Sequence, residues 1–407
     1  MTADAEATPQ REAPLPAAER IEALDVLRGV ALFGIFIMNM PSFSNSIFTP
    51  PPVQDGSLNG IAMALREALV AGKFNLMFGL VFGIGFTLQL RRLEAADPSQ
   101  AVPVYMRRLA VLLAIGLLHA ALLWMGDVLV AYSVLGFALL AIRRMPDSAL
   151  LALLGLCLVY PVTSDVLAAH LFSNETNMLA MFEFNQFASS NDVAFGQGSF
   201  VDAVRETMRV FVWAYATPMG LFTVAAFFVQ MATGILIGCY IGRQRWIERL
   251  PTLAAPLRRA QIAALGIALL AGAIAFGLAG AETDKTGTTL ATSFARTLGR
   301  AALMCFYLTS VLRLLGVPAG ARMLRPFALA GRMPLSNYLL QTLMGTFIFY
   351  GWGLGFWGRA TPLIETALAT ALFFVVQLPL SAAWLARFRY GPVEYLWRRL
   401  TYGRISA

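Results

Sequence analysis

Three polar residues in the first hydrophobic stretch are spaced so that a helix would place them on one face. Asp25 and Arg28 open this stretch, and Asn39 lies near its end. At 100° per residue, Asp25 and Arg28 are helical neighbours, and Asn39 follows Arg28 by three turns plus about 20°. Ionisable groups this close to hydrocarbon are costly unless they have partners or face a water-filled cavity. The spacing predicts a polar stripe with about 16 Å of helix between Arg28 and Asn39; the alternative is a purely structural ion pair.

A candidate general base lies in the third hydrophobic stretch. The chain has only two histidines, and His119 falls near the middle of this stretch. Imidazole changes its charge near neutral pH, which suits it to general acid–base catalysis. Asp127 follows eight residues later, about 80° around a helix, so helical spacing alone does not pair the two. His119 is therefore a candidate catalytic base with Asp127 nearby; the alternative is a histidine that only satisfies hydrogen bonds in the core.

The elements that position these residues are hydrophobic stretches, which dominate the 407-residue chain. Hydrophobic residues make up 58% and charged residues 13%, against about 25% charged in soluble domains, and the mean hydropathy is +0.66. Apolar stretches of about 20 residues indicate spanning helices rather than barrel strands. We predict an all-α fold, a polytopic integral membrane helical bundle of about ten transmembrane helices, near residues 24–42, 73–90, 108–125, 127–142, 148–168, 212–241, 260–280, 290–312, 334–356 and 363–386.

The remaining segments lie around this bundle. Residues 1–20, rich in Ala, Pro and Glu, are predicted to be a disordered cytoplasmic N-terminus, and residues 21–390 to form the bundle. External segments are expected near 43–72 and 169–211. The second is interpreted either as an interfacial helix on the outer leaflet or as a cap over an external site. Residues 391–407 are predicted to be a cytoplasmic interfacial tail.

Basic residues occur in groups between alternate spans. Most arginines lie near 91–108, 143–144, 243–259, 313–332 and 387–404, and the opposite connections carry few. By the positive-inside rule these loops and both termini are cytoplasmic. The formal charge of +8 therefore indicates membrane topology and not nucleic-acid binding.

Some kinds of chemistry lack their usual motifs. The histidines and the three cysteines show no metal-ligand spacing, so no metal site is expected. There is no Walker loop and no GxSxG motif, which argues against ATP-driven transport by this chain alone. The cysteines fall in apolar stretches and are expected to be free thiols; they are Cys157, Cys239 and Cys305.

Short motifs spread over nearly the whole chain carry a resemblance to a known family. They are RIEALDVLRGVA at 20–31, KF at 73–74, FGIGF at 82–86, GLLH at 116–119, WMGD at 124–127, GRMPLSNY at 331–338, GPVE at 391–394 and WR at 397–398. Their combination resembles the YeiB-like bacterial inner-membrane family, whose C-terminal part is a domain of unknown function. The resemblance implies a multi-pass protein of the bacterial inner membrane.

The opening motif is also similar to that of two groups of transmembrane acyltransferases, heparan-alpha-glucosaminide N-acetyltransferase and the acyltransferase-3 proteins. Both transfer an acyl group from cytoplasmic acyl-CoA to an acceptor across the membrane. The acyltransferase-3 pattern has a catalytic histidine at the position of Asn39. The glucosaminide enzyme has asparagine there and a catalytic histidine in the next external loop, but residues 42–53 of this chain contain none. His119 is the available substitute.

The resemblance thus implies an acyltransferase that uses acyl-CoA, such as acetyl-CoA, as donor and needs no metal. Guanidinium groups suit the phosphates of the donor, and an asparagine near the thioester would stabilise a developing oxyanion. The candidates for donor binding are Arg28, Asp25, Lys73, Arg332 and Asn337, and the candidates for catalysis are His119, Asn39 and Asp127. Asn337 has an alternative role in hydrogen bonds between helices, each worth about 0.6 kcal/mol.

Two other classes of function remain open. Ten helices with buried polar residues fit a transporter of a small organic or lipid-like solute equally well, although no internal repeat is evident. A noncatalytic scaffold is the third reading. Expected partners are membrane lipids and a small-molecule or glycan acceptor, with no nucleic acid, and the resemblance to the dimeric glycan enzyme implies a homodimer. A passage beside the first helix would favour the first two classes.

Overall fold

The computed structural model describes residues 17–49, 57–172, 174–278 and 286–403. Throughout this part of the chain every regular element is a helix and no strand occurs, so the predicted all-α fold is confirmed. The predicted disordered segment 1–20 lies mostly outside the described residues. Its last four residues are helical, because the first helix, α1 (Ala17–Ser44), already begins there.

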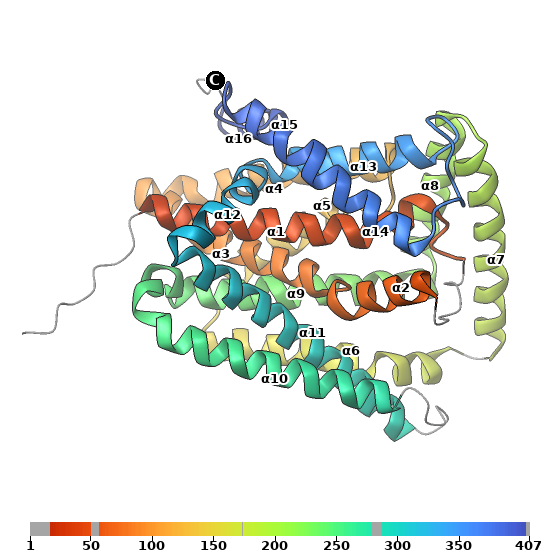
Figure 1. Ribbon diagram of the computed structural model, residues 1–407, viewed down its shortest axis with the longest axis horizontal. Helices are drawn as coiled ribbons and strands as arrows, with labels where there is room; N and C mark the ends of the chain where they lie inside the picture. Colours follow the sequence, from red (N-terminus) through yellow and green to blue (C-terminus); the bar gives the residue numbers. More distant parts are fainter. Residues whose placement is uncertain (1–16, 50–56, 173, 279–285, 404–407) are drawn as a thin grey trace, which may run out of the picture.

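Each of the ten predicted spans corresponds to helical structure, and Figure 1 shows most of these helices running along one common direction. They are α1, α3 (Lys73–Ala96), α4 (Pro98–Leu122), α5 (Leu129–Ala141), α6 (Asp147–Leu171), α9 (Pro218–Arg243), α10 (Ala254–Leu278), α11 (Thr286–Leu315), α13 (Pro334–Phe349), and the continuous helix formed by α14 (Pro362–Ala371), a π-helical segment (Leu372–Gln377) and α15 (Leu378–Leu385). Within the described residues, eight helical segments are long and apolar enough to cross a membrane.

Two of the predicted spans are shorter than a membrane. Helix α5 has 13 residues and α13 has 16, which correspond to about 20 and 24 Å against a hydrocarbon core of about 30 Å. Irregular backbone at membrane depth is tolerated where protein buries it or where it lines a cavity. Both helices do line the cavity described below, through Leu129 and Tyr132 of α5 and through Leu335 and Tyr338 of α13.

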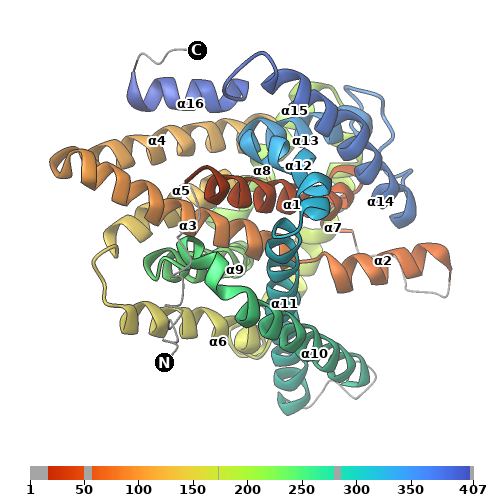
Figure 2. The ribbon, with the colours of Figure 1, turned by 60° about the vertical axis from the view of Figure 1, so that its left-hand side comes forward.

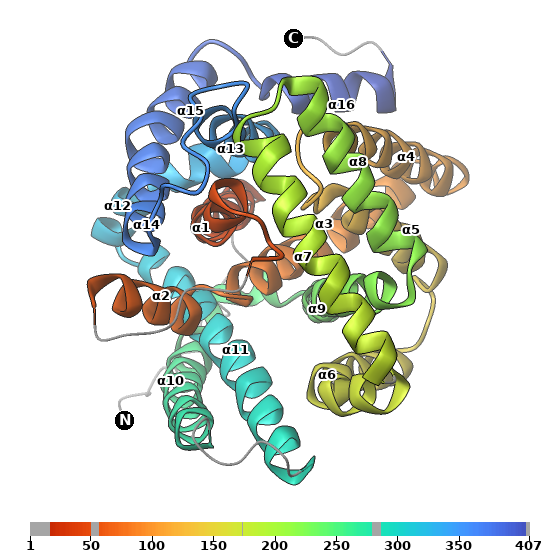
Figure 3. The same ribbon diagram turned by 90° about the vertical axis from the view of Figure 1, so that its right-hand side faces the viewer.

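The remaining helices flank the bundle or cross its ends. They are α2 (Leu58–Leu69), α7 (Asn174–Gly196), α8 (Phe200–Ala216), a 3-10 helix (Trp246–Leu253), α12 (Pro318–Arg332) and α16 (Pro392–Tyr402). Figures 1 and 3 show α7 running across the end of the bundle at which α1 terminates, with α8 beside it. These two helices occupy the predicted external segment near 169–211.

The predicted sixth span, 212–241, is wrong at its start. Helix α8 ends at Ala216, and a separate helix, α9, begins at Pro218. A residue before proline is disfavoured in the helical conformation, and Thr217 is extended with its hydroxyl accepting a hydrogen bond from the Gly220 amide at 3.1 Å. The proline therefore divides the predicted span into an end-capping helix and a membrane helix.

A buried ion pair ties three helices together at the end of the bundle covered by α7. The Arg66 guanidinium of α2 lies 2.6 Å from a carboxylate oxygen of Glu365 in α14. The other oxygen of Glu365 accepts hydrogen bonds from Ser44 at 2.5 Å and from Asn45 at 3.2 Å, at the end of α1. The Glu365 side chain is 4% exposed and that of Arg66 is 12% exposed. Every charge here has a partner, as a buried pair requires.

Glycines let α3 and α9 pack at backbone distance. The sequence repeats Gly234, Gly238 and Gly242 at every fourth position of α9, and Gly79 and Gly83 in α3. A Cβ atom on Gly238 would lie 1.9 Å from the Leu80 carbonyl oxygen, and one on Gly83 would lie 2.1 Å from the Ile235 carbonyl oxygen. Small residues at this spacing allow close helix packing in membranes. The contact fixes α3, which supplies one wall of the cavity.

Replacing Gly238 by valine should therefore destabilise the fold by about 3 kcal/mol or more, because backbone atoms must separate to admit the side chain. The measurement is the thermal unfolding midpoint of the purified protein in mild detergent. Gly266→Val in α10 is the matched control, since a Cβ there has no atom within 4 Å. Equal midpoints for the two variants would contradict this account of the α3–α9 contact.

Candidate functional site

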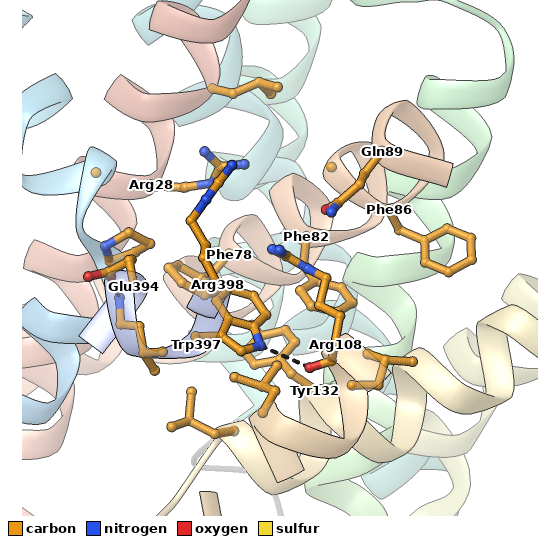
Figure 4. A pocket seen from close by; sticks show the side chains of 18 of the residues that line it. Arg28, Phe78, Phe82, Phe86, Gln89, Arg108, Tyr132, Glu394, Trp397 and Arg398 are labelled. Atoms are coloured by element: carbon orange, nitrogen blue, oxygen red, sulfur yellow. Dashed lines mark hydrogen bonds between the residues drawn. The ribbon is translucent and has the colours of Figure 1, made fainter. Parts of the chain in front are cut away.

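One cavity of about 570 Å³ opens beside α1. Its walls come from α1, α3, α4, α5, the α12–α13 junction and α16, and Figure 4 shows the side chains that line it. On α1 the lining residues are Leu24, Arg28, Leu32 and Ile35, which recur at helical spacing on one face. The predicted stripe from Arg28 therefore faces a cavity as far as Ile35, which is about 10 Å of helix.

The mouth of the cavity is strongly basic. Arg28 lies about three turns from the start of α1, and its guanidinium is paired with the Asp25 carboxylate at 2.7 Å. The predicted ion pair is thus present, with Arg28 on the cavity wall and Asp25 buried behind it. Five arginines from separate parts of the chain line this cavity: Arg28, Arg92, Arg108, Arg332 and Arg398. Such a concentration of guanidinium groups attracts an anionic ligand.

The interior of the cavity is apolar and aromatic. Phe78 and Phe82 of α3 face Tyr132 of α5, whose ring centroid lies 5.5 Å from that of Phe78 and 5.0 Å from that of Phe82. Leu109 and Leu112 of α4 complete this part of the wall. A cavity with a basic mouth and an apolar interior suits an amphiphile with an anionic head.

Helix α16 closes one side of the cavity and is held there by a carboxylate. Glu394 accepts hydrogen bonds from the Leu335 amide at 2.6 Å and the Ser336 amide at 3.0 Å, and from the Ser336 hydroxyl. These amides belong to the first turn of α13, where backbone N–H groups are otherwise unpaired and negative charge is favoured. Burial raises the pKa of the Glu394 carboxyl, and the hydrogen bonds from Ser336 and Leu335 oppose that rise.

Two further contacts attach α16 to the cavity walls. The Trp397 indole donates a hydrogen bond to the Arg108 carbonyl oxygen at 2.9 Å, and the Arg108 guanidinium lies 3.7 Å from the centroid of the same indole. Near the end of α16, the Gln89 amide donates to the Tyr402 hydroxyl at 2.7 Å. Figure 2 shows α16 lying along α4. The predicted interfacial tail is thus also a cavity wall.

His119 and Asp127 are brought into direct contact. His119 Nδ1 lies 2.7 Å from Asp127 Oδ1, and His119 Nε2 lies 3.0 Å from the Thr342 hydroxyl. The helix that carries His119 ends at Leu122, and the turn that follows returns the chain toward the imidazole. The other Asp127 oxygen accepts from the Val130 amide at 2.6 Å, which fixes the carboxylate. Helical spacing did not predict this pairing because the two residues do not share a helix.

A tyrosine separates this pair from the cavity. Tyr338 lines the inner end of the cavity, and its ring centroid lies 5.2 Å from that of His119. The Tyr338 hydroxyl accepts a hydrogen bond from the Val128 amide at 3.2 Å and donates to the Gly126 carbonyl at 3.4 Å. His119 itself is only 3% exposed and does not line the cavity. A ligand would reach the imidazole only if the Tyr338 ring moved.

Of the other predicted site residues, Arg332 lines the cavity and Asn39 does not. Arg332 lies on the cavity wall with Arg28. Asn39 lies one turn beyond Ile35 on the same face of α1, half-buried and outside the cavity lining, and its side chain makes no hydrogen bond to the described residues. Of the five residues predicted to bind the donor, Arg28 and Arg332 therefore line the cavity. The three catalytic candidates, His119, Asn39 and Asp127, do not line it.

Lys73 and Asn337 lie apart from the cavity. Lys73 is at the opposite end of α3 from the cavity mouth, where its ammonium donates to the Glu67 carbonyl at 2.7 Å. The Asn337 amide donates to the Ala330 carbonyl and to the Ser381 hydroxyl, each at 3.0 Å. Asn337 is 1% exposed, so it has the alternative role of joining helices α12, α13 and α15.

Sequence reasoning missed several residues of the cavity. The sequence identifies Arg108 and Arg398 as topology-setting arginines, and Trp397 and Arg398 as a family motif, but it assigns none of the three to a ligand site. Nearly 300 positions separate Arg108 from Trp397, and no local pattern pairs them. Glu394 was identified only as part of a family motif. Its place shortly after the last hydrophobic span, among arginines, was the one available signal of a special role.

Known proteins match this chain over most of its length. Residues 241–404 match the family model described as "Protein of unknown function (DUF418)". The uncharacterized protein YxaH of Bacillus subtilis (strain 168) is 30% identical over 398 residues, covering 94% of both chains. The uncharacterized protein YeiB of Escherichia coli (strain K12) is 25% identical over 94% of this chain and 96% of its own length. The chain therefore belongs to the YeiB-like family that shares the DUF418 domain.

Proposed function

We propose that this protein is a transmembrane acyltransferase, which takes an acyl group from acyl-CoA on the cytoplasmic side and delivers it to an acceptor at the outer side. One observation carries the proposal: the cavity has a basic mouth and an apolar interior, and it ends at Tyr338, directly in front of the His119–Asp127 pair. The phosphates of the donor would bind at the arginines, and its pantetheine arm would follow the apolar wall of α1 and α3.

The chemistry requires a base, a partner that orients the base, and a donor carbonyl. Asp127 holds Nδ1 of His119, which leaves Nε2 to take the proton from the hydroxyl or amine of the acceptor. The acceptor oxygen or nitrogen forms a bond to the thioester carbonyl carbon, and the carbon–sulfur bond then breaks. The proton passes from His119 to the departing thiolate. Thr342 occupies Nε2 in this structure, so the acceptor would displace it.

The sidedness of the proposal rests on the basic loops. Arg243, at the end of α9, donates to the carbonyl oxygens of Arg143 at 2.9 Å and Met145 at 2.6 Å, and lies 3.2 Å from Asp147. These contacts gather two of the predicted cytoplasmic loops at one end of the bundle. The cavity mouth uses arginines of the same set of loops, and α7 and α8 lie at the opposite end. We place the protein in the bacterial inner membrane with both termini in the cytoplasm.

The acceptor is proposed to be a small molecule or a glycan that approaches beneath α7 and α8. Helix α8 packs against α4, the helix that carries His119. Of the two roles predicted for segment 169–211, this proximity favours the cap over an external site. Membrane lipids surround the bundle, and a homodimer stays an expectation from the resemblance alone.

The proposal is tested with purified protein in lipid nanodiscs and acetyl-CoA labelled in the acetyl group. We expect release of free CoA thiol and transfer of label to an acceptor in an extract of the bacterial envelope. Binding of a panel of acyl-CoAs by native mass spectrometry identifies the preferred chain length. If the protein neither releases free CoA thiol nor binds any acyl-CoA, the proposal is overturned. Uptake of a labelled solute into proteoliposomes without thiol release would favour the transporter instead.

A further inference from the structure

Four of the five arginines that line the cavity, Arg92, Arg108, Arg332 and Arg398, have no carboxylate partner among the described residues, and two of them, Arg108 and Arg398, flank Trp397. Among the described residues, no Asp or Glu oxygen lies within 4 Å of a side-chain nitrogen of Arg108 or Arg398. Arg28 differs from them because Asp25 pairs with it. The one carboxylate on the cavity wall, Glu394, is already bound to the first turn of α13. The mouth therefore holds an excess of positive charge, which is costly close to hydrocarbon.

Arg398 has a donor with no acceptor. Its Nε atom is buried and has no hydrogen-bond partner among the described residues, although its guanidinium lies 4.4 Å from the centroid of the Tyr390 ring. A buried donor that is left unpaired costs about 1–3 kcal/mol, and more when the group is charged. An acceptor from a ligand would remove this cost.

Trp397 fixes the position of Arg108 beside this unpaired group. The indole hydrogen bond to the Arg108 carbonyl locks the ring, and the ring in turn supports the Arg108 guanidinium from one face. Figure 4 shows Arg28, Arg108, Trp397 and Arg398 around the same space. Stacking on the indole uses the flat face of the guanidinium, so the N–H donors in its plane can still bind an anion.

We propose that Arg108, Trp397 and Arg398 form a phosphate subsite, which binds the phosphate head of an amphiphile whose tail enters the apolar interior. Phosphate offers several acceptor oxygens, and it therefore satisfies two guanidinium groups better than a single carboxylate does. The phosphate could belong to a nucleotide thioester such as CoA or to a lipid headgroup. This inference rests on the proposed function only for the first of these two sources.

The experiment measures dissociation constants for the full-length protein in nanodiscs of neutral lipid. The probes are CoA, pantetheine, which has the arm but no phosphate, and dioctanoyl phosphatidic acid. Replacing Arg108 or Arg398 by glutamine should weaken phosphate binding about tenfold or more, because each removes hydrogen bonds to a charged group. Pantetheine binding should be weak and unchanged. Arg108→Lys should give an intermediate loss, since it keeps the charge without the fork.

Arg399→Gln is the matched control, because Arg399 is the neighbouring arginine on α16, is exposed and does not line the cavity. Thermal unfolding without ligand checks that each variant is folded. Equal losses in Arg398→Gln and Arg399→Gln, or measurable binding of CoA with the same affinity as pantetheine, would overturn the subsite. So would the failure of both CoA and phosphatidic acid to bind.

The outcomes separate this subsite from acyl transfer. Arginine-dependent binding of phosphatidic acid without CoA binding supports the subsite and removes the proposed donor. If replacing Arg108 or Arg398 does not change acyl-CoA turnover, the acyltransferase proposal is supported and the phosphate subsite is rejected. Arginine-dependent CoA binding supports both.

Discussion

Replacing His119 by glutamine should lower the rate of acyl transfer by roughly 10²- to 10⁴-fold, the range that a general base contributes. Glutamine can still hydrogen-bond to Asp127 and Thr342, the two partners of the imidazole, but it cannot take a proton. Donor binding should persist because His119 lies outside the cavity lining. The measurement is thiol release at saturating acyl-CoA, together with the dissociation constant for CoA.

The chain supplies its own control for this experiment. His170, the other histidine, is exposed, and its described hydrogen bond is to the Val166 carbonyl of its own helix. His170→Gln should leave transfer unchanged. Asp127→Asn should also reduce transfer, because the amide no longer orients and stabilises the charged imidazole. Full activity in His119→Gln would show that the base lies elsewhere or that no base is needed.

Removal of either partner of the Arg66–Glu365 pair should give the largest loss of stability, about 3–5 kcal/mol. Glu365→Met leaves the guanidinium buried without a counter-charge, and it also removes the acceptor for Ser44 and Asn45. Arg66→Met should cost less, because those two donors still satisfy one oxygen of the carboxylate. The free energy of unfolding in mixed detergent micelles is the quantity to measure.

The double variant distinguishes a buried pair from simple loss of packing. Replacing both charges by methionine leaves no uncompensated charge, so it should cost less than the sum of the two single variants. The exposed pair of Arg205 and Asp202, whose side chains are 77% and 46% exposed, is the reference; its removal should cost less than about 1 kcal/mol. Additive losses at Arg66 and Glu365 would contradict the assigned coupling.

The sequence predicted the helices well because a membrane imposes length and composition on each span. It also predicted which face of α1 carries Arg28 and Asn39, since helical spacing sets that face directly; the cavity borders this face from Arg28 to Ile35 and does not reach Asn39. The start of α9 was missed because hydropathy continues through Ala216 while Pro218 interrupts the backbone. The break between α8 and α9 therefore depends on the backbone restriction at Pro218, which mean hydropathy over a stretch of residues does not detect.

The site was predictable only in part, because it depends on contacts between distant segments. His119 was found from residue type, but its pairing with Asp127 depends on a turn after Leu122 that helical periodicity does not describe. Asn337 shares a family motif with cavity residues, and Lys73 begins the helix that carries several others, yet both side chains bond to groups away from the cavity. The meeting of Arg108 with Trp397 arises from the docking of α16 on α4, which no local pattern encodes.

The position of α16 late in the chain has a consequence for biogenesis. The ribosome makes the other walls of the cavity first, and the membrane receives them before Glu394 exists to bind the first turn of α13. The docking of α16 therefore completes the cavity after its other walls have been made. A ligand that binds only the finished cavity would stabilise that step by mass action, so its supply during synthesis would influence how much mature protein accumulates.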